Sequence, residues 1–393
     1  MNDYSKASEL LYKGDHIEGM ELSPEAVPVF FNTAFSMRNL TEVKKTYAAG
    51  GYTYIRTRNP NRDALAEAVS FLENGEKSLI FSSGMGAITT TLMTLLQPGD
   101  HVLCNSDIYG ETYDVMGLLM KKFGVESDLV KFDDLARVEA ACKPNTKMLY
   151  TEVMSNPTMN LVDIEGIAKI AHARGAHLMV DNTFTTPLAV CPIDLGADIV
   201  INSLTKFMNG HSDAIGGSIT ASAEIIDRIH PIRMLCGTPG DPFSSWLILR
   251  GLHTIELRVP KQMENAAKIA AALEADPHVC KVNHPSLESF PQHELAKRMF
   301  TGKGMSGMLS FIVPEDMEKI DRFMEKLHFA HYAMTLGGLR TTLNHTCTSS
   351  HAHVPDDVRR KMGITPGMFR LSVGIEDADD LIADFRQALT VFD

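Results

Sequence analysis

The amino-acid sequence predicts an α/β protein with a mostly parallel central sheet, followed by a smaller α/β domain. Two observations predict this class. From about residue 61, apolar runs of four to six residues alternate with segments of helical periodicity, which is typical of a parallel sheet covered by helices on both faces. A long helical stretch over about 240–275 then separates this alternation from a second set of strand-like and helical segments.

The sequence divides into three regions along the chain. Residues 1–60 lack periodicity and are broken by proline and glycine, so we expect an arm of the kind that packs on a neighbouring subunit. Residues 61–250 would form the large domain, with helices at 62–73, 84–96, about 110–123 and 163–174, and strands at 78–82, 101–105, 147–151, 177–181, 198–202 and 216–220. Residues 251–393 would form the smaller domain, with a strand at 308–313 and helices near 317–327 and 378–390.

The composition is that of a globular protein with small-molecule partners. The chain has 393 residues, 44% of them hydrophobic, and a net charge of −12 without a basic run. This charge pattern argues against nucleic-acid and membrane partners. No stretch reaches the roughly 20 apolar residues of a membrane span, and the first residues lack a signal-peptide pattern. We therefore expect a cytoplasmic location.

A candidate anion site follows the strand at 78–82. The sequence SSGMG opens the next helix, so the N–H groups of Gly84 and Met85 and the positive end of that helix favour a phosphate. On these residues alone, a tight strand-to-helix turn without a ligand explains the glycines equally well.

A second group of polar residues follows the strand at 198–202. Ser203 and Thr205 stand beside Lys206, and two hydroxyls next to an amine suit a phosphate held beside an imine-forming lysine. The alternative is an exposed loop lysine. Asp181 ends the strand at 177–181, where a carboxylate can keep the ring nitrogen of pyridoxal 5′-phosphate (PLP) protonated. Capping of the following turn is the alternative for Asp181.

Together these residues resemble the Cys/Met-metabolism PLP-dependent enzymes, the family of cystathionine γ-synthase, cystathionine γ-lyase and methionine γ-lyase. The resemblance runs from about residue 50 to the C-terminus and implies the aspartate aminotransferase-like fold of type I PLP enzymes. It rests on motifs in one order, namely YIRTRNP (54–60), SSGMGA (82–87), IYGET (108–112), Glu152 with Asn156-Pro157, VDNTF (180–184), SLTK (203–206), DPFSSWLILRGLHT (241–254), TLGGL (335–339) and RLSVGIE (370–376).

The resemblance implies roles for single residues. Lys206 would form the Schiff base with PLP and carry protons between substrate carbons, Asp181 would pair with the ring nitrogen, and Tyr109 would stack on the ring and assist proton transfer. Residues of two subunits would hold the phosphate: Gly84, Met85, Ser203 and Thr205 of one, and Tyr54 and Arg56 of the other.

The substrate carboxylate would be bound by Asn156 and Arg370, whose planar guanidinium suits a bidentate contact. A structural ion pair is the alternative for Arg370. The resemblance further implies a homotetramer built as a dimer of dimers.

The expected pocket rim departs from the family. Glu111 stands where many members have Gly or Cys, Thr335 and Arg340 differ from the family string S-L-G-G/D-x-E, and Asn344-His345-Thr346-Cys347 replaces H-P-A-S. We assign Glu111, Thr335 and Arg340 to the substrate side. Two hypotheses stay open: Glu111 and Arg340 pair as a gate, or they bind a zwitterionic distal group such as that of cystathionine.

A metal site is not expected. His345, Cys347, His351 and His353 are of zinc-ligand types, but their spacing fits no standard zinc pattern, and the family has a substrate-entrance loop here. The six cysteines are scattered without C-x-x-C spacing, as suits reduced thiols.

These expectations predict a PLP-dependent carbon–sulfur lyase. It would catalyse α,γ-elimination, with α,β-elimination as a further reaction, on methionine, cystathionine, homocysteine or cysteine, giving a 2-oxo acid, ammonia and a thiol. The alternative is a γ-replacement transferase of the cystathionine γ-synthase or O-acylhomoserine sulfhydrylase type. A non-catalytic PLP-binding protein is disfavoured, because every cofactor position carries the expected residue.

Overall fold

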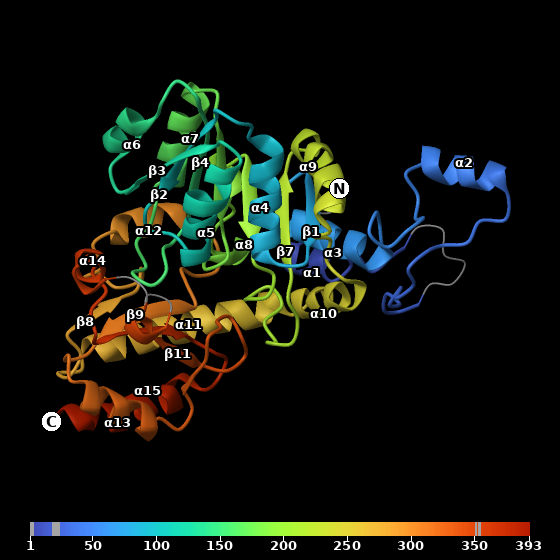
Figure 1. Ribbon diagram of the computed structural model, residues 1–393. Helices are drawn as coiled ribbons and strands as arrows, with labels where there is room; N and C mark the ends of the chain where they lie inside the picture. The colour runs from blue at the N-terminus through green and yellow to red at the C-terminus, as the bar shows by residue number, and fades with distance from the viewer. Residues whose placement is uncertain (1–3, 18–23, 350–351, 353–354) are drawn as a thin grey trace.

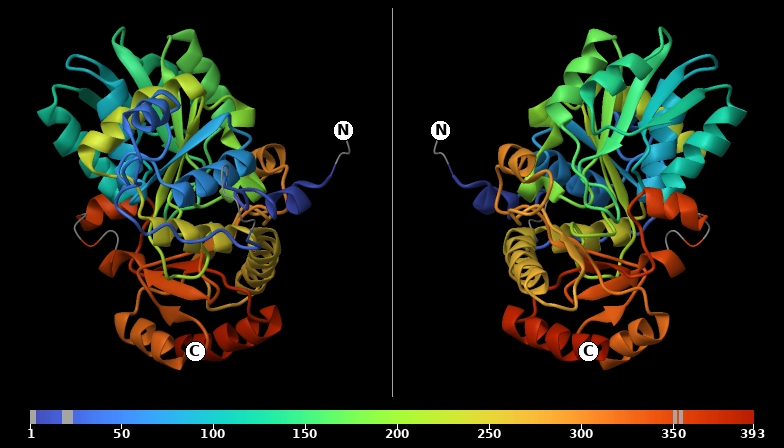
Figure 2. Two further views of the ribbon diagram at one scale, coloured as in Figure 1. Left: turned by 90° about the vertical axis from the view of Figure 1, so that its right-hand side faces the viewer. Right: turned by 90° about the vertical axis from the view of Figure 1, so that its left-hand side faces the viewer.

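Two β-sheets with covering helices make up the body of the molecule (Figure 1). The computed structural model describes residues 4–17, 24–349, 352 and 355–393. The larger sheet is built from strands within residues 77–221 and the smaller one from strands within residues 281–372, and both lie in one elongated body with the smaller sheet at one end (Figures 1 and 2).

The larger sheet has seven strands among the described residues and is mostly parallel, as predicted. Four of its six strand pairs are parallel, and β7 is antiparallel to both of its neighbours. The spatial order is β1 (Lys77–Phe81), β7 (Gly217–Ala221), β6 (Ile199–Asn202), β5 (His177–Asp181), β4 (Thr146–Glu152), β2 (His101–Asn105) and β3 (Glu126–Val130).

Helices cover both faces of this sheet and divide its core in two, because successive strand residues point to opposite sides. Leu178 and Val180 of β5 pack with helices α3 and α7, whereas Met179 packs with α4 and α9. The helices of this region are α3 (Pro60–Leu72), α4 (Gly84–Leu95), α5 (Gly110–Asp114) with the π-helical segment Val115–Met120, α6 (Leu135–Ala141), α7 (Ile164–Ala173), α8 (Thr186–Ala189) and α9 (Ala223–Cys236).

The predicted helical stretch at 240–275 is two helices, α10 (Pro242–Leu252) and α11 (Ile255–Glu274). The break falls at His253 and Thr254, and α11 runs from the larger sheet to the smaller one (Figure 1). Buried side chains of both helices belong to the same hydrophobic core as Leu178. The connection between the two sheets is therefore a packed helix.

The smaller sheet has five strands in the described part of the chain and is antiparallel except for one pair. Helices α13 (Met317–Lys326) and α15 (Ala378–Leu389) cover it, while α12 (His293–Met299) and α14 (Asp356–Lys361) flank it (Figure 1). Its strands are, in spatial order, β10 (His331–Tyr332), β11 (Thr342–His345), β12 (Met368–Ser372), β9 (Met308–Ile312) and β8 (Lys281–Asn283).

The N-terminal segment leaves the body of the molecule. Helix α1 (Lys6–Leu10) packs on α3 through the fully buried Leu10, whereas α2 (Leu40–Ala48) buries no residue and projects into solvent (Figures 1 and 2). Neither helix was predicted. Among the described residues, no helix is long and apolar enough to cross a membrane.

Candidate active site

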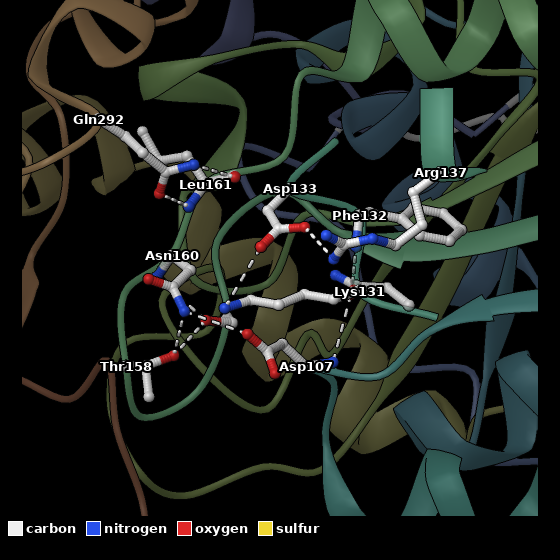
Figure 3. Close-up of polar contacts among 11 residues, drawn as sticks. Asp107, Lys131, Phe132, Asp133, Arg137, Thr158, Asn160, Leu161 and Gln292 are labelled. Atoms are coloured by element: carbon white, nitrogen blue, oxygen red, sulfur yellow. Dashed lines mark hydrogen bonds and ion pairs between the residues drawn. The ribbon is translucent and has the colours of Figure 1, made fainter. Parts of the chain in front are cut away.

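Loops at the carboxyl ends of neighbouring strands meet at one edge of the larger sheet. The loop after β2 and the loop after β4 are tied together by Asn160, whose side-chain amide donates to Asp107 Oδ2 and to Thr158 Oγ1 at 3.1 Å each (Figure 3). Gln292 secures the second loop by exchanging two hydrogen bonds, of 2.7 and 2.6 Å, with the backbone of Leu161 (Figure 3). These contacts fix the loops that carry Tyr109 and Asn156.

The predicted phosphate loop lies against the predicted lysine loop. Ser83 caps α4 by accepting a 3.0 Å hydrogen bond from Gly86 N–H, so the helix begins at Gly84 and Met85. A β-carbon on Gly84 would lie 3.1 Å from Cβ of Ser203. The N-terminus of α4 and the Ser203 side chain thus share one small space, which is suited to an anion.

Thr205 contributes to the shape of this loop. Its hydroxyl donates to the carbonyl of Gly216 at 3.2 Å and accepts from the N–H of Gly216 at 3.1 Å. The hydroxyl therefore joins the lysine loop to the start of β7.

Lys206 is half-buried at the end of the same loop. Burial lowers the pKa of its amine, and the nearby Arg370 lowers it further, while Glu111 acts in the opposite direction. An amine in such surroundings is more readily neutral, as imine formation requires. The structure thus brings Lys206, Arg370 and Glu111 within electrostatic reach of one another.

Asp181 and Glu152 are paired neighbours on β5 and β4. Burial raises the pKa of both carboxyls, and the proximity of Asp181 raises that of Glu152 further. Asp181 accepts a 2.9 Å hydrogen bond from Thr183 N–H, and in the described chain no cation forms an ion pair with it. The buried hydroxyl of the neighbouring Tyr150 also has no hydrogen-bond partner there. A protonated ring nitrogen would supply the positive charge that Asp181 needs, so the residues fit PLP.

Tyr109 stands at the N-terminus of α5, with its ring 40% exposed. Its backbone N–H donates a 2.6 Å hydrogen bond to Glu152 Oε1. Burial raises the pKa of the Tyr109 hydroxyl, and a hydrogen bond with Glu111 raises it further. Glu111 therefore lies beside the phenol as well as near Lys206.

Arg370 comes from β12 of the smaller sheet and is 7% exposed. It donates at 3.2 Å to Asn156 Oδ1 and at 3.2 Å to the Thr335 carbonyl, and its Nε has no partner among the described residues. Burial lowers the pKa of Arg370 to about 10. A buried guanidinium with unused donors is suited to a substrate carboxylate.

Other predicted residues lie outside this cluster. Tyr54 is 46% exposed, and Arg56 lies over its ring and donates at 3.1 Å to the carbonyl of Met234. Neither residue is hydrogen-bonded to the Lys206 loop in the described chain. Arg340 is exposed, and no ion pair joins it to Glu111 within the described ranges.

The predicted zinc-type cluster can be followed only in part, since His351 and His353 lie outside the described residues. The ring nitrogens of His345 contact Thr348 Oγ1 at 3.0 Å and the Pro366 carbonyl at 2.6 Å. The thiol of Cys347 donates to the Thr365 carbonyl at 3.1 Å. These side chains are engaged in the fold of the loop.

Two contacts of the site were not predicted. Thr183 Oγ1 accepts a 2.8 Å hydrogen bond from Ser203 N–H, and Glu152 supports the backbone of Tyr109. Both residues stand within motifs, VDNTF and the Glu152…Asn156 pair, but neither motif shows which partner it contacts.

This arrangement, on a mostly parallel sheet with a second small sheet, defines a PLP-dependent enzyme. Residues 9–390 match the family model described as "Cys/Met metabolism PLP-dependent enzyme". The chain belongs to this family, as its motifs predicted, and its cofactor is PLP.

Three similar proteins illustrate the family. The cystathionine gamma-lyase of Bacillus subtilis (strain 168) is 43% identical over 340 residues, covering 86% of this chain and 89% of the relative. The L-methionine gamma-lyase of Treponema denticola is 37% identical over 370 residues, covering 93% and 92%. A crystal structure of cystathionine gamma synthase from Xanthomonas oryzae pv. oryzae superimposes with a TM-score of 0.92 at 32% identity, covering 99% of this chain and 98% of that chain. The fold prediction is therefore confirmed.

Proposed function

We propose that this protein is a PLP-dependent carbon–sulfur lyase that eliminates a thiol from the γ-carbon of a sulfur amino acid such as methionine or cystathionine, giving a 2-oxo acid and ammonia. Elimination at the β-carbon is a further reaction of the same site. The proposal rests mainly on one observation: Lys206, whose amine has a lowered pKa, lies within electrostatic reach of the buried Arg370. Relatives named as γ-lyases support elimination over other PLP reactions.

One group of residues binds the cofactor and another binds the substrate. When bound, PLP supplies an electron sink for charge that develops at substrate carbons. Lys206 holds the cofactor covalently, and its amine moves protons between substrate carbons. Asp181 would keep the ring nitrogen protonated, and Tyr109 would contact the ring and assist proton transfer. The phosphate is held by Gly84, Met85, Ser203 and Thr205.

Arg370 and Asn156 orient the substrate by its carboxylate, with the Thr335 carbonyl fixing the guanidinium. The far end of the substrate points toward Glu111. Of the two hypotheses for Glu111 and Arg340, binding of a distal zwitterion is the one we keep, because Arg340 is exposed and free of an ion pair in the described chain. Equal release of product from cystathionine by the wild type, Glu111→Ala and Arg340→Ala would reject it.

The projecting arm supports an oligomer. Phe31, Leu40 and Tyr47 are 73%, 77% and 67% exposed, and such apolar surface is normally covered by a partner. We propose that residues 1–60 bring Tyr54 and Arg56 to the phosphate of a neighbouring subunit, in a homotetramer of two dimers. Residues 61–250 then form the PLP-binding domain and residues 251–393 the smaller one. A cytoplasmic location suits free cysteines and a cytoplasmic amino-acid substrate.

The deciding experiment is an assay of 2-oxo acid release by the PLP-loaded protein. Methionine, cystathionine, homocysteine, cysteine and O-acetylhomoserine are each supplied with and without an added thiol. Release of 2-oxobutyrate without thiol is expected and would rank the substrates. A thioether formed only with added thiol would identify the alternative, a γ-replacement transferase of the kind seen in the cystathionine gamma synthase relative. Normal turnover by Lys206→Ala would reject the mechanism.

A further inference from the structure

We infer that Glu73 is a positioning residue that fixes the cofactor-binding ends of β5 and β6 from the opposite face of the sheet. Glu73 follows the last residue of α3, and its side chain is 0% exposed. Within the described ranges, its side chain is hydrogen-bonded to none of the residues assigned above to PLP. The inference rests on the proposed assignment of Asp181 and Ser203–Lys206 to the cofactor.

The carboxylate of Glu73 joins two adjacent strands through Asn202, the last residue of β6, and Asn182, the residue after β5. Oε1 accepts hydrogen bonds from Asn202 Nδ2 at 2.6 Å and from Asn182 Nδ2 at 3.1 Å, and Oε2 lies 3.3 Å from the same Asn182 nitrogen. Both asparagines are buried, at 1% and 0% exposure. Asn182 Nδ2 also donates at 3.0 Å to the Val190 carbonyl, so removing the carboxylate would leave the Asn202 amide without its acceptor and the Asn182 amide with one acceptor fewer.

The alternation of side chains places Glu73 and the cofactor on opposite faces. Val180 packs in the core that contains α3, and Asn182, two residues later, points the same way, toward Glu73. Met179 packs in the core that contains α4, and Asp181 follows it toward the phosphate loop on that face. Each asparagine is the direct chain neighbour of a residue assigned to PLP.

The two strand ends are also linked on the cofactor side. Thr183 donates its N–H to Asp181 at 2.9 Å and accepts the N–H of Ser203 at 2.8 Å. A shift of Asn182 or Asn202 therefore moves the ring-nitrogen partner and the phosphate ligand relative to each other. Glu73 acts on cofactor geometry through these backbone connections.

The charge of Glu73 responds to pH near neutrality. Burial raises its pKa to about 7, and the hydrogen bonds from Asn202 and Asn182 oppose this rise. Lys6 of α1 also lowers the pKa, whereas Asp194, in the turn Pro192–Leu195, raises it. Cys191 also lies close to Glu73. Burial and the charge of Glu73 raise the pKa of the Cys191 thiol to about 12, so this thiol is uncharged near neutrality. A charged acceptor forms stronger hydrogen bonds with amide donors than a neutral one. The hydrogen bonds from Asn182 and Asn202 to Glu73 should therefore strengthen above pH 7.

The test measures the dissociation constant of PLP from the apoprotein by cofactor absorbance, without turnover. Glu73→Leu removes the acceptor, and we expect affinity to fall about tenfold, the effect of one lost hydrogen bond with a donor left unsatisfied. Glu73→Gln keeps one acceptor oxygen and should restore most of the affinity. Glu67→Gln on the exposed side of the same helix, where Glu67 lies 4.0 Å from Lys13, is the matched control and should equal the wild type.

The pH dependence of PLP affinity distinguishes a positioning role of Glu73 from a role in protein stability alone. Between pH 6 and 8 the wild type should gain affinity relative to Glu73→Gln, because glutamine does not titrate. An unchanged dissociation constant in Glu73→Leu, with only the apoprotein's melting temperature lowered, would overturn the inference. If Glu73→Leu does not fold, parallel pH profiles of the wild type and Glu73→Gln would overturn it. Failure of the proposed function would show differently, as identical cofactor absorbance in wild type and Lys206→Ala.

Discussion

Gly337 lies so close to Phe207 that a β-carbon on the glycine would be 2.4 Å from the Phe207 nitrogen. The same β-carbon would be 2.8 Å from the carbonyl carbon of Lys206, and Gly337 has a φ of +76°. Gly337 also donates its N–H to Ser372 Oγ at 2.8 Å, beside β12. The TLGGL loop therefore packs between the lysine loop and the smaller sheet, and there is no room for a side chain at position 337.

A β-carbon at position 337 should weaken cofactor binding. We expect Gly337→Ala to raise the dissociation constant of PLP by roughly 5- to 150-fold, since it must push the Lys206–Phe207 peptide aside, and overpacking of this kind costs about 1–3 kcal/mol. Gly363→Ala is the matched control, because Gly363 has a similar φ of +80° but nothing within 4 Å. Equal losses in both variants would assign the effect to the positive φ alone.

The planar guanidinium of Arg370 should be needed for substrate binding but not for cofactor binding. Lysine at this position keeps the charge but cannot bridge Asn156 and Thr335 while holding a carboxylate. We expect Arg370→Lys to lower kcat/KM about 100-fold and to leave the affinity for PLP unchanged. Arg386→Lys, on the exposed side of α15, should behave as the wild type. Parallel losses of substrate and cofactor binding would contradict this division.

Acid should destabilise the smaller sheet through His284. This ring is buried after β8 between Ser286 Oγ at 2.6 Å and the Ser306 carbonyl at 3.1 Å, and burial lowers its pKa to about 4. Since the unfolded value is about 6.5, the fold favours the neutral ring, and stability present above pH 6.5 is lost as pH falls toward 4. Relative to His284→Gln, the wild type should lose roughly 3 kcal/mol of unfolding free energy over this range. Urea titrations at several pH values would test this, and parallel curves would contradict it.

The smaller sheet should depend on one aromatic cluster. Phe323 of α13 is 0% exposed and packs on Phe311, Phe369 and Phe385, with ring centroids 5.4–6.4 Å apart. We expect Phe323→Ala to lower the free energy of unfolding by about 3–5 kcal/mol. Phe329→Ala removes a ring that is 50% exposed and should change it by much less. Comparable losses, measured by urea unfolding, would show that the cluster is not a centre of stability.

The fold was predictable where burial leaves a clear pattern. The strands at His101–Asn105 and His177–Asp181 have the predicted bounds, because continuous apolar runs mark strands buried on both faces. Strand β3, ESDLV, lies at the sheet edge and is partly exposed, so its sequence shows no such run and it was not predicted. The break at His253 was missed because the nearby Gly251 lies inside α10 and no proline stands at the break.

The site was predictable where chemistry stands directly after a strand. Asp181 ends one strand that the sequence reveals and Lys206 lies shortly after another, whereas the contact of Arg370 with Asn156 joins residues 214 positions apart. Nothing in the sequence indicated a role for Glu73, since a glutamate after a helix is usually exposed. Its burial depends on amides brought from two other strands.

Arg370, which we propose binds the substrate, lies on the smaller sheet, whereas Lys206, which we propose binds the cofactor, lies in a loop of the larger sheet, and helix α11 runs between the two sheets (Figure 1). Under the proposed function, an amino acid whose carboxylate is bound by Arg370 and whose amino group is bound by the cofactor on Lys206 therefore connects residues of the two sheets. Ligands that keep both the amino group and the carboxylate should make the molecule harder for a protease to cut in the segments between the sheets. Ligands without a carboxylate should give less protection, however tightly the cofactor is held.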